Sequence, residues 1–169
     1  MRWLMLAAAV VMAASSTMAA SGQVLPPPSL GGPVAAFEQV LGGPNDASIG
    51  ALLHYQRCAG TTVDQFVLLA PNDQVWTIQR VWCAPTSVAP DERLADAAQF
   101  LPTDAVPADA STTELGEPVR TYVSSTLAAT LPPSLFHDCA GQAVPPGTLF
   151  IVADTFGGWY MGPGTCPGG

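Results

Sequence analysis

The sequence of 169 residues contains no lysine, and its five basic residues are outnumbered by 13 acidic ones, which gives a formal net charge of −8. Nucleic-acid binding depends on basic contacts to phosphates. Anionic membrane surfaces likewise attract basic segments and repel acidic domains. The composition therefore argues against nucleic-acid partners and against a membrane surface, and it leaves uncharged or basic partners open.

Local signatures of catalysis are also missing. The chain has no G-x-S-x-G motif, and its glycine-rich stretch FGGWYMGPG lacks the lysine and the following helix of a phosphate-binding loop. No two cysteines form a C-x-x-C pair, so neither the redox nor the zinc-knuckle signature is present. None of these stretches implies a cofactor.

The first 20 residues have the organisation of a secretory signal peptide. Arg2 precedes an uncharged run from Trp3 to Ala14, and small residues allow cleavage after Ala19 or Ala20. The apolar run is shorter than the roughly 20 residues of a membrane-spanning helix. We therefore expect a secreted protein, extracellular or periplasmic, with no membrane attachment after removal of residues 1–20. An uncleaved membrane anchor is the alternative.

The rest of the chain has the length of one domain. Residues 21–33 include three consecutive prolines and are predicted to be a disordered lead-in. Residues 34–169 are predicted to form a single disulfide-stabilised domain, and we expect a monomer.

Hydrophobic patterns and turn residues predict an α+β domain with a mainly antiparallel sheet. Residues 103–117 are polar and acidic and are interpreted as a long loop with at most one short extended piece. The expected elements are a helix at 33–41, a three-strand meander at 51–58, 63–70 and 74–83, a helix at 89–102, a strand at 118–124, a short helix at 125–136 broken by prolines, and a hairpin at 147–164 turning around Asp154 to Gly158.

The order of a helix followed by a meander, with FEQVLGGP before the strands, resembles small exported modules of the β-lactamase-inhibitor-like and outer-membrane assembly-lipoprotein type. The resemblance covers Val34 to Cys83 and is one of architecture. Those modules act mostly by binding other proteins, so the resemblance implies a binding role. No binding residue can be carried over, because no position-specific motif matches.

The four cysteines, an even number in an exported chain, favour two disulfides. We favour the pairs Cys58–Cys83 and Cys139–Cys166, each stabilising the fold by about 3 kcal/mol through a closed loop of roughly 25 residues. If the meander loops have four residues each, Val63 lies opposite both Cys58 and Trp82. Cys58 and Cys83 then face opposite sides, so their bond requires a bulge, an odd-length loop or curled strand ends.

The same register divides the meander into two faces. One face is predicted to carry Leu52, His54, Gln56, Cys58, Val67, Leu69, Trp76, Ile78 and Trp82, and the other Tyr55, Phe66, Leu68, Val75, Val81 and Cys83.

Three chemical alternatives involve titratable side chains. His54, Cys58, His137 and Cys139 are the right types for a zinc site, and Cys139 beside either histidine could be a nucleophile. The acidic stretch Asp104, Asp109, Glu114 and Glu117 could offer oxygen ligands to calcium. The spacings match no familiar module, so we favour disulfides, a half-buried His54, a loop position for His137 and a solvated acidic loop. No catalytic or metal-binding residue is assigned.

Aromatic residues at the terminal hairpin supply a candidate binding surface. Phe156, Trp159 and Tyr160 surround glycines at the turn, where exposed aromatic side chains can bind protein or sugar. The alternative, which we favour, is that these rings cover the core, as large aromatics usually do.

Together these features favour an exported, non-catalytic binding or interaction module for an unknown protein or a neutral ligand. A small exported hydrolase-type enzyme using His54, His137 or an acidic pair is the alternative. A passive envelope or matrix protein is a third interpretation.

Overall fold

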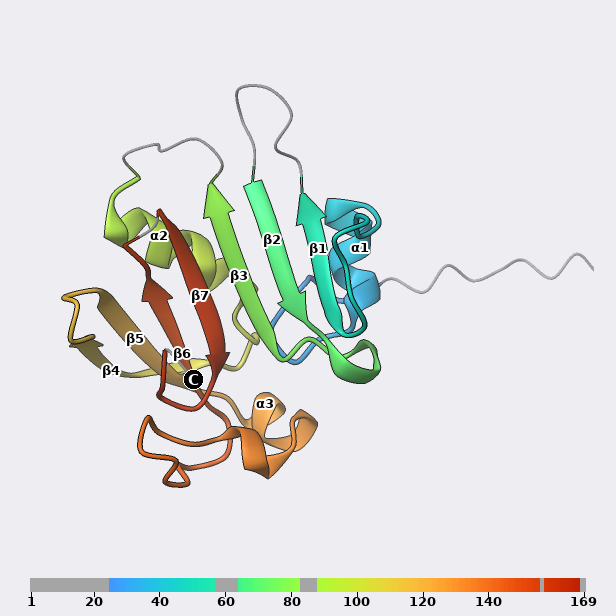
Figure 1. The fold of residues 1–169 in the computed structure, drawn as a ribbon. Helices are drawn as coiled ribbons and strands as arrows, with labels where there is room; N and C mark the ends of the chain where they lie inside the picture. Colours follow the sequence, from blue (N-terminus) through green and yellow to red (C-terminus); the bar gives the residue numbers. More distant parts are fainter. Residues whose placement is uncertain (1–24, 57–63, 83–87, 156, 168–169) are drawn as a thin grey trace, which may run out of the picture.

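The computed structural model describes residues 25–56, 64–82, 88–155 and 157–167. Within these ranges the chain forms one seven-stranded antiparallel sheet with three α-helices, which confirms the α+β prediction (Figure 1). The elements are α1 (Val34–Leu41), β1 (Leu52–Gln56), β2 (Asp64–Leu69), η1 (Pro71–Asp73), β3 (Thr77–Trp82), α2 (Pro90–Ala97), η2 (Ala98–Phe100), β4 (Val106–Thr112), β5 (Pro118–Val123), α3 (Ser125–Thr130), η3 (Pro133–Leu135), β6 (Thr148–Ala153) and β7 (Gly158–Pro163).

The strand order across the sheet is β1-β2-β3-β7-β6-β5-β4. The predicted meander and the predicted terminal hairpin are both present, and β7 pairs with β3 so that the end of the chain joins its first half. The hairpin turns where expected, because the Asp154 amide donates to the Gly158 carbonyl and the Asp154 carboxylate accepts from the Gly158 amide.

One register in the meander differs from the prediction. Strand β1 pairs with β2 as expected, but Trp82 on β3 lies opposite Asp64 rather than Val63. The connection is one residue longer than four, and two of its residues, Asn72 and Asp73, adopt positive φ values of 53° and 61°. A shift of one residue in the pairing register moves every side chain of the strand to the opposite face of the sheet.

The predicted faces are therefore wrong for β3. Ile78 and Trp82 lie on the same side of the sheet as Phe66 and Leu68, and Val81 lies on the opposite side. Ile78 is fully buried, as a residue on the core side should be.

Helices α1 and α2 cover one face of the sheet (Figure 1). Four aromatic rings join them to it. The Phe100 ring of η2 has its centroid 5.9 Å from Phe37 of α1, 5.7 Å from Phe66 of β2 and 5.6 Å from Trp159 of β7. The core of the molecule therefore lies between the helices and this face.

A polar contact fixes α2 against the sheet. The Asp96 carboxylate accepts hydrogen bonds from Arg80 Nη1 on β3 at 2.5 Å and from Trp159 Nε1 on β7 at 2.6 Å. The Arg80 guanidinium lies 5.0 Å from the ring centroid of Phe66 and 4.7 Å from that of Trp82. The cation is thus held by an acid and by two aromatic faces.

One predicted boundary is wrong, and the extended piece allowed within residues 103–117 is a strand of seven residues. The fold begins before Val34, because Leu30 is 2% exposed and its amide donates to the Phe100 carbonyl. The lead-in predicted to be disordered is therefore ordered at its last residues. Part of the predicted 103–117 loop forms β4, whose seven residues are all exposed and show no apolar alternation in the sequence.

Candidate functional site on the open face of the sheet

The face opposite α1 and α2 runs across all seven strands. Residues paired across an antiparallel sheet point to the same side. The strand pairings define one continuous row on this face, which consists of Ser111, Val119, Val152, Tyr160, Gln79, Val67 and His54.

The part of this face on β1, β2 and β3, which we call the open face, is uncharged apart from the titratable His54. No described helix lies over it (Figure 1). Its side chains are partly exposed, a contrast with the buried residues on the helix side of the same strands. The open face consists of Leu52, His54, Gln65, Val67, Leu69, Thr77, Gln79 and Val81.

Tyr160 marks the boundary between the open face and a small second core. Its ring lies 5.5 Å from the Phe150 ring, and Phe150 packs with Val119 and Val152, all three of them buried. Burial raises the pKa of the Tyr160 hydroxyl, and a hydrogen bond with Thr77 partly offsets this.

The predicted aromatic surface does not exist as one patch. Trp159 is fully buried on the helix side, whereas Tyr160 points to the opposite side and is partly buried. Phe156 lies outside the described residues. The sequence could not separate these neighbours, because alternation along β7 sends adjacent rings to opposite faces.

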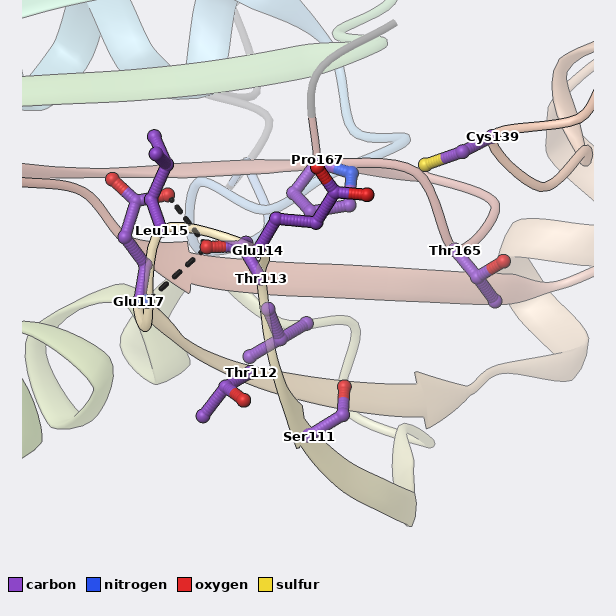
Figure 2. A pocket seen from close by; sticks show the side chains of 10 residues that line it. Ser111, Thr112, Thr113, Glu114, Leu115, Glu117, Cys139, Thr165 and Pro167 are labelled. Atoms are coloured by element: carbon purple, nitrogen blue, oxygen red, sulfur yellow. Dashed lines mark hydrogen bonds between the residues drawn. The ribbon is translucent and has the colours of Figure 1, made fainter.

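A groove of about 440 Å³ lies beside the second core, between the loop joining β4 to β5 and the C-terminal segment (Figure 2). Val119 is among its lining residues, so the groove lies at the β4–β5 end of the row that crosses the sheet. Its lining consists of Ser111, Thr112, Thr113, Glu114, Leu115, Glu117, Val119, Cys139, Thr165 and Pro167.

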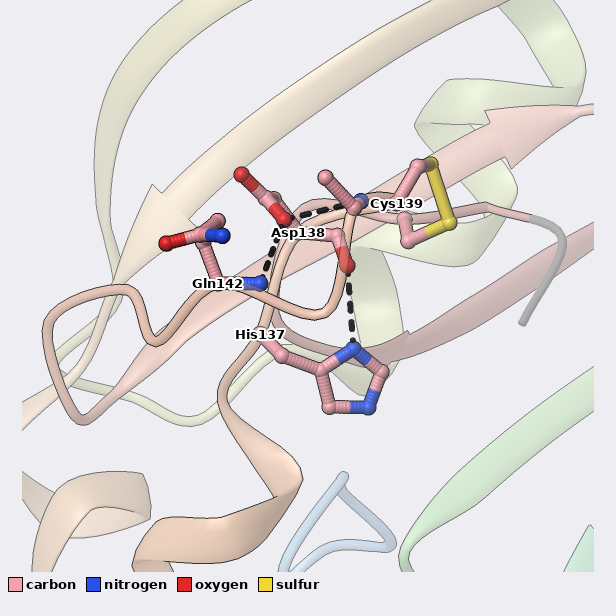
Figure 3. Close-up of a disulfide and its surroundings, with 6 residues drawn as sticks. His137, Asp138, Cys139 and Gln142 are labelled. Atoms are coloured by element: carbon pink, nitrogen blue, oxygen red, sulfur yellow. Dashed lines mark hydrogen bonds between the residues drawn. A yellow bond between two sulfur atoms is a disulfide. The ribbon is translucent and has the colours of Figure 1, made fainter.

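A disulfide between Cys139 and Cys166 holds the C-terminal segment at this groove, as predicted (Figure 3). The Cα atoms of the two cysteines are 4.7 Å apart. The loop carrying Cys139 is shaped by Asp138, whose Oδ1 accepts from the amides of Ala140 and Gln142. Cys58 and Cys83 lie outside the described residues.

The structure does not assemble the zinc site or the thiol nucleophile considered from sequence. Cys139 Sγ is bonded to another sulfur and is neither a thiolate nor a metal ligand in this form. His54 lies on the open face, with its Nδ1 3.4 Å from Gln65 Nε2, whereas the His137 ring contacts the Asp138 carbonyl. Within the described ranges, no three His, Cys, Asp or Glu side chains are grouped for a metal ion.

The acidic stretch is divided among separate structural roles. Asp104 accepts from the hydroxyls of Ser124 and Ser125 at 2.6 and 2.7 Å and from the Thr126 amide at 2.8 Å, which holds the start of α3. These bonds lower the pKa of Asp104 well below its usual range, with the Ser124 bond as the largest cause. On β4, Asp109 accepts from the Ala110 amide.

Sequence reasoning missed both the open face and the groove. The open face could have been found from the alternation in β1 and β2, which placed His54 and Val67 on one side correctly. The groove had no local signal, because its walls come from the β4–β5 loop and the C-terminal segment. In the part of the chain that the structure describes, no helix has the length and apolar composition needed to cross a membrane.

A scan against protein-family models and searches of the curated proteins and of the solved structures found no significant match.

Proposed function

We propose that this chain is an exported, non-catalytic binding module that contacts an uncharged surface of its partner through the open face. The observation that carries the proposal is the composition of that face. A chain with a net charge of −8 presents eight partly exposed side chains there without a single acid or arginine. Depletion of charge is typical of the centre of a protein interface.

The edges of the sheet are poor alternatives, because local hydrogen bonds occupy the β1 edge and the β4 edge carries residues that discourage strand pairing. On β1, the His54 amide donates to Ser48 Oγ and the His54 carbonyl accepts from the Asn45 amide. On β4, Asp109 and Pro107 flank an irregular register, and both a charge and a proline discourage pairing with another strand. Binding by the face is therefore more consistent with the fold than strand addition at an edge.

Export is supported by two independent features. The first 20 residues have the organisation of a signal peptide, and the Cys139–Cys166 disulfide suits an oxidising compartment. The resemblance of the helix and meander to small exported binding modules points to the same role.

Site-specific photo-crosslinking tests the proposal. A photoreactive amino acid replaces Gln79 on the open face in one strain and Gln39, an exposed glutamine of α1, in a matched strain. Each variant is expressed in the organism that exports the protein and is irradiated in the culture. We expect a discrete protein adduct from the Gln79 position and not from the Gln39 position.

A second pair of variants controls for random collisions. Val67→Glu, which adds a charge beside Gln79, should abolish the adduct, whereas Val40→Glu on the exposed side of α1 should not. Equal crosslinking at the two glutamine positions, or no adduct at either, would refute a binding role for this face.

A further inference from the structure

The groove beside the disulfide carries a negative charge that nothing in its lining balances. Glu114 and Glu117 both line it, and none of its described lining residues is basic. The carboxylate of Glu117 is engaged, since one oxygen accepts from the Thr155 amide at 2.8 Å and the other from Thr113 Oγ1 at 3.2 Å.

Glu114 differs from Glu117 because it is exposed and makes no hydrogen bond or ion pair with any residue in the described ranges. In Figure 2 its side chain extends from the β4–β5 loop toward the segment that carries Pro167. The basic residue nearest in sequence, Arg120, follows Val119 on β5 and therefore points to the other side of the sheet. Its Nη1 donates to the Val119 carbonyl.

The remaining lining combines apolar surface with hydroxyl groups. Val119 is 4% exposed and Leu115 is 76% exposed, and Pro167 contributes a second apolar wall. The hydroxyls of Ser111, which pairs with Val119, and of Thr165 have oxygens that can accept from a bound N–H group. The volume of about 440 Å³ falls in the range of small-molecule sites, which is roughly 300 to 1,000 Å³.

These features favour an organic cation over a metal ion. A hard metal ion such as calcium requires six to eight oxygen ligands. The groove offers one unengaged carboxylate, and no metal-type group of three acidic, His or Cys side chains occurs among the described residues. An apolar surface next to a single carboxylate suits instead a ligand with a charged head and an aliphatic stem.

We propose that this groove binds a small organic cation of the alkylammonium type, with the ammonium group beside Glu114 and the alkyl stem against Val119 and Pro167. The remaining N–H groups of the ammonium donate to the hydroxyls that line the groove. This site goes beyond the proposed function, because it does not depend on whether the open face has a partner.

Titration of the disulfide-bonded, isotope-labelled protein with n-butylammonium chloride, followed by amide NMR, tests the proposal. We expect saturable shifts at Thr113, Glu114 and Thr165, with a Kd on the order of millimolar, since one exposed ion pair adds little to a short alkyl stem. The neutral analogue 1-butanol should bind at least about threefold more weakly, and sodium chloride alone should not reproduce the shifts.

Two variants with the same change in net charge separate the site from the general acidity of the protein. Glu114→Gln should weaken n-butylammonium binding by about threefold or more, which is the range of one exposed ion pair. Glu38→Gln, at an exposed position on α1, should leave the Kd unchanged. Equal Kd values in the wild type and Glu114→Gln, equal binding of 1-butanol, or no saturable shifts at the groove would overturn the proposal. None of these outcomes would alter crosslinking from Gln79.

Discussion

At the scale of single residues, Asp96 connects α2 to two strands of the sheet. Its two carboxylate oxygens accept from Arg80 and Trp159, which lie on neighbouring strands of the sheet. The Arg80 and Asp96 side chains are only 17% and 21% exposed, so solvent screens this ion pair weakly.

Replacement of Asp96 by alanine should therefore lower the free energy of unfolding by about 3 kcal/mol, because a mostly buried cation would lose one of its contacts and an indole N–H would lose this acceptor. Urea unfolding followed by tryptophan fluorescence measures the change. Asp91→Ala, at an exposed position in the first turn of the same helix, should cost less than about 1 kcal/mol. Equal losses in the two variants would contradict the role assigned to Asp96.

Single-residue burial was the weakest part of the sequence prediction. The sequence left Trp159 and Tyr160 as a joint surface candidate, and only the packing of Phe66, Phe100 and α2 against β7 shows that Trp159 is core. Such contacts join segments far apart in the chain and leave no local pattern. By contrast, the predicted loop position of His137 beside the disulfide is confirmed. The prediction succeeded because Cys139, two residues further along the chain, forms the expected bond to Cys166.

At the scale of elements, patterns with strong local chemistry were predicted well. Strands β1 and β2, the β6–β7 hairpin and the helix that begins at Pro90 all follow from apolar alternation or from helix-start residues. The predicted register of β3 was wrong, because the sequence of the turn did not reveal its length or the positive φ values of two of its residues. The sequence allowed an extended piece within residues 103–117 but could not give the position and length of β4, because an exposed edge strand needs no apolar side chains.

Asp104 joins the segment before β4 to the start of α3, and it should make the stability of the fold depend on pH. Its hydrogen bonds to Ser124, Ser125 and Thr126 stabilise the ionised form, so its pKa is lower in the folded chain than in the unfolded chain. A lowered pKa contributes stability above the unfolded value of about 4, and this contribution is lost as pH falls toward the folded value.

We therefore expect Asp104→Asn to lower the melting temperature at pH 7 and to reduce the dependence of stability on pH below about 4. Thermal unfolding followed by circular dichroism between pH 2 and pH 7 measures both effects. The matched variant Asp46→Asn, at an exposed position before β1, should retain the wild-type profile. If Asp104→Asn lost stability below about pH 4 in the same way as the wild type, these bonds would not contribute to stability.

At the scale of the whole molecule, most of the surface of the sheet is covered or protected. The helices cover one face, local contacts or a proline and an acid block the two edges, and the C-terminal segment borders the groove at the β5 end of the other face. The uncharged part on β1 to β3 has no described helix over it, and it is the surface through which we propose that a partner binds. The α+β class followed from the sequence, whereas this division of surfaces did not, because it depends on β7 pairing with β3.

The Cys139–Cys166 disulfide ties the end of the chain to this arrangement. It joins residues 27 positions apart, and the C-terminal segment it holds is also fixed by bonds from the Gly164 amide to the Thr148 carbonyl and from the Thr165 amide to the His137 carbonyl. The double variant Cys139→Ala, Cys166→Ala should lose about 3 kcal/mol of unfolding free energy, because the unfolded chain regains the freedom of the closed loop.

Urea unfolding measures this loss, and amide exchange at Thr165 reports whether the C-terminal segment opens. We expect faster exchange at Thr165 and at groove residues such as Thr113, while amides of the β1–β2 pair keep their protection because that pair has its own ladder of bonds. The variant should also lose n-butylammonium binding and keep the Gln79 crosslink. Unchanged exchange at Thr165 together with unchanged stability would mean that packing and backbone hydrogen bonds alone hold the segment in place.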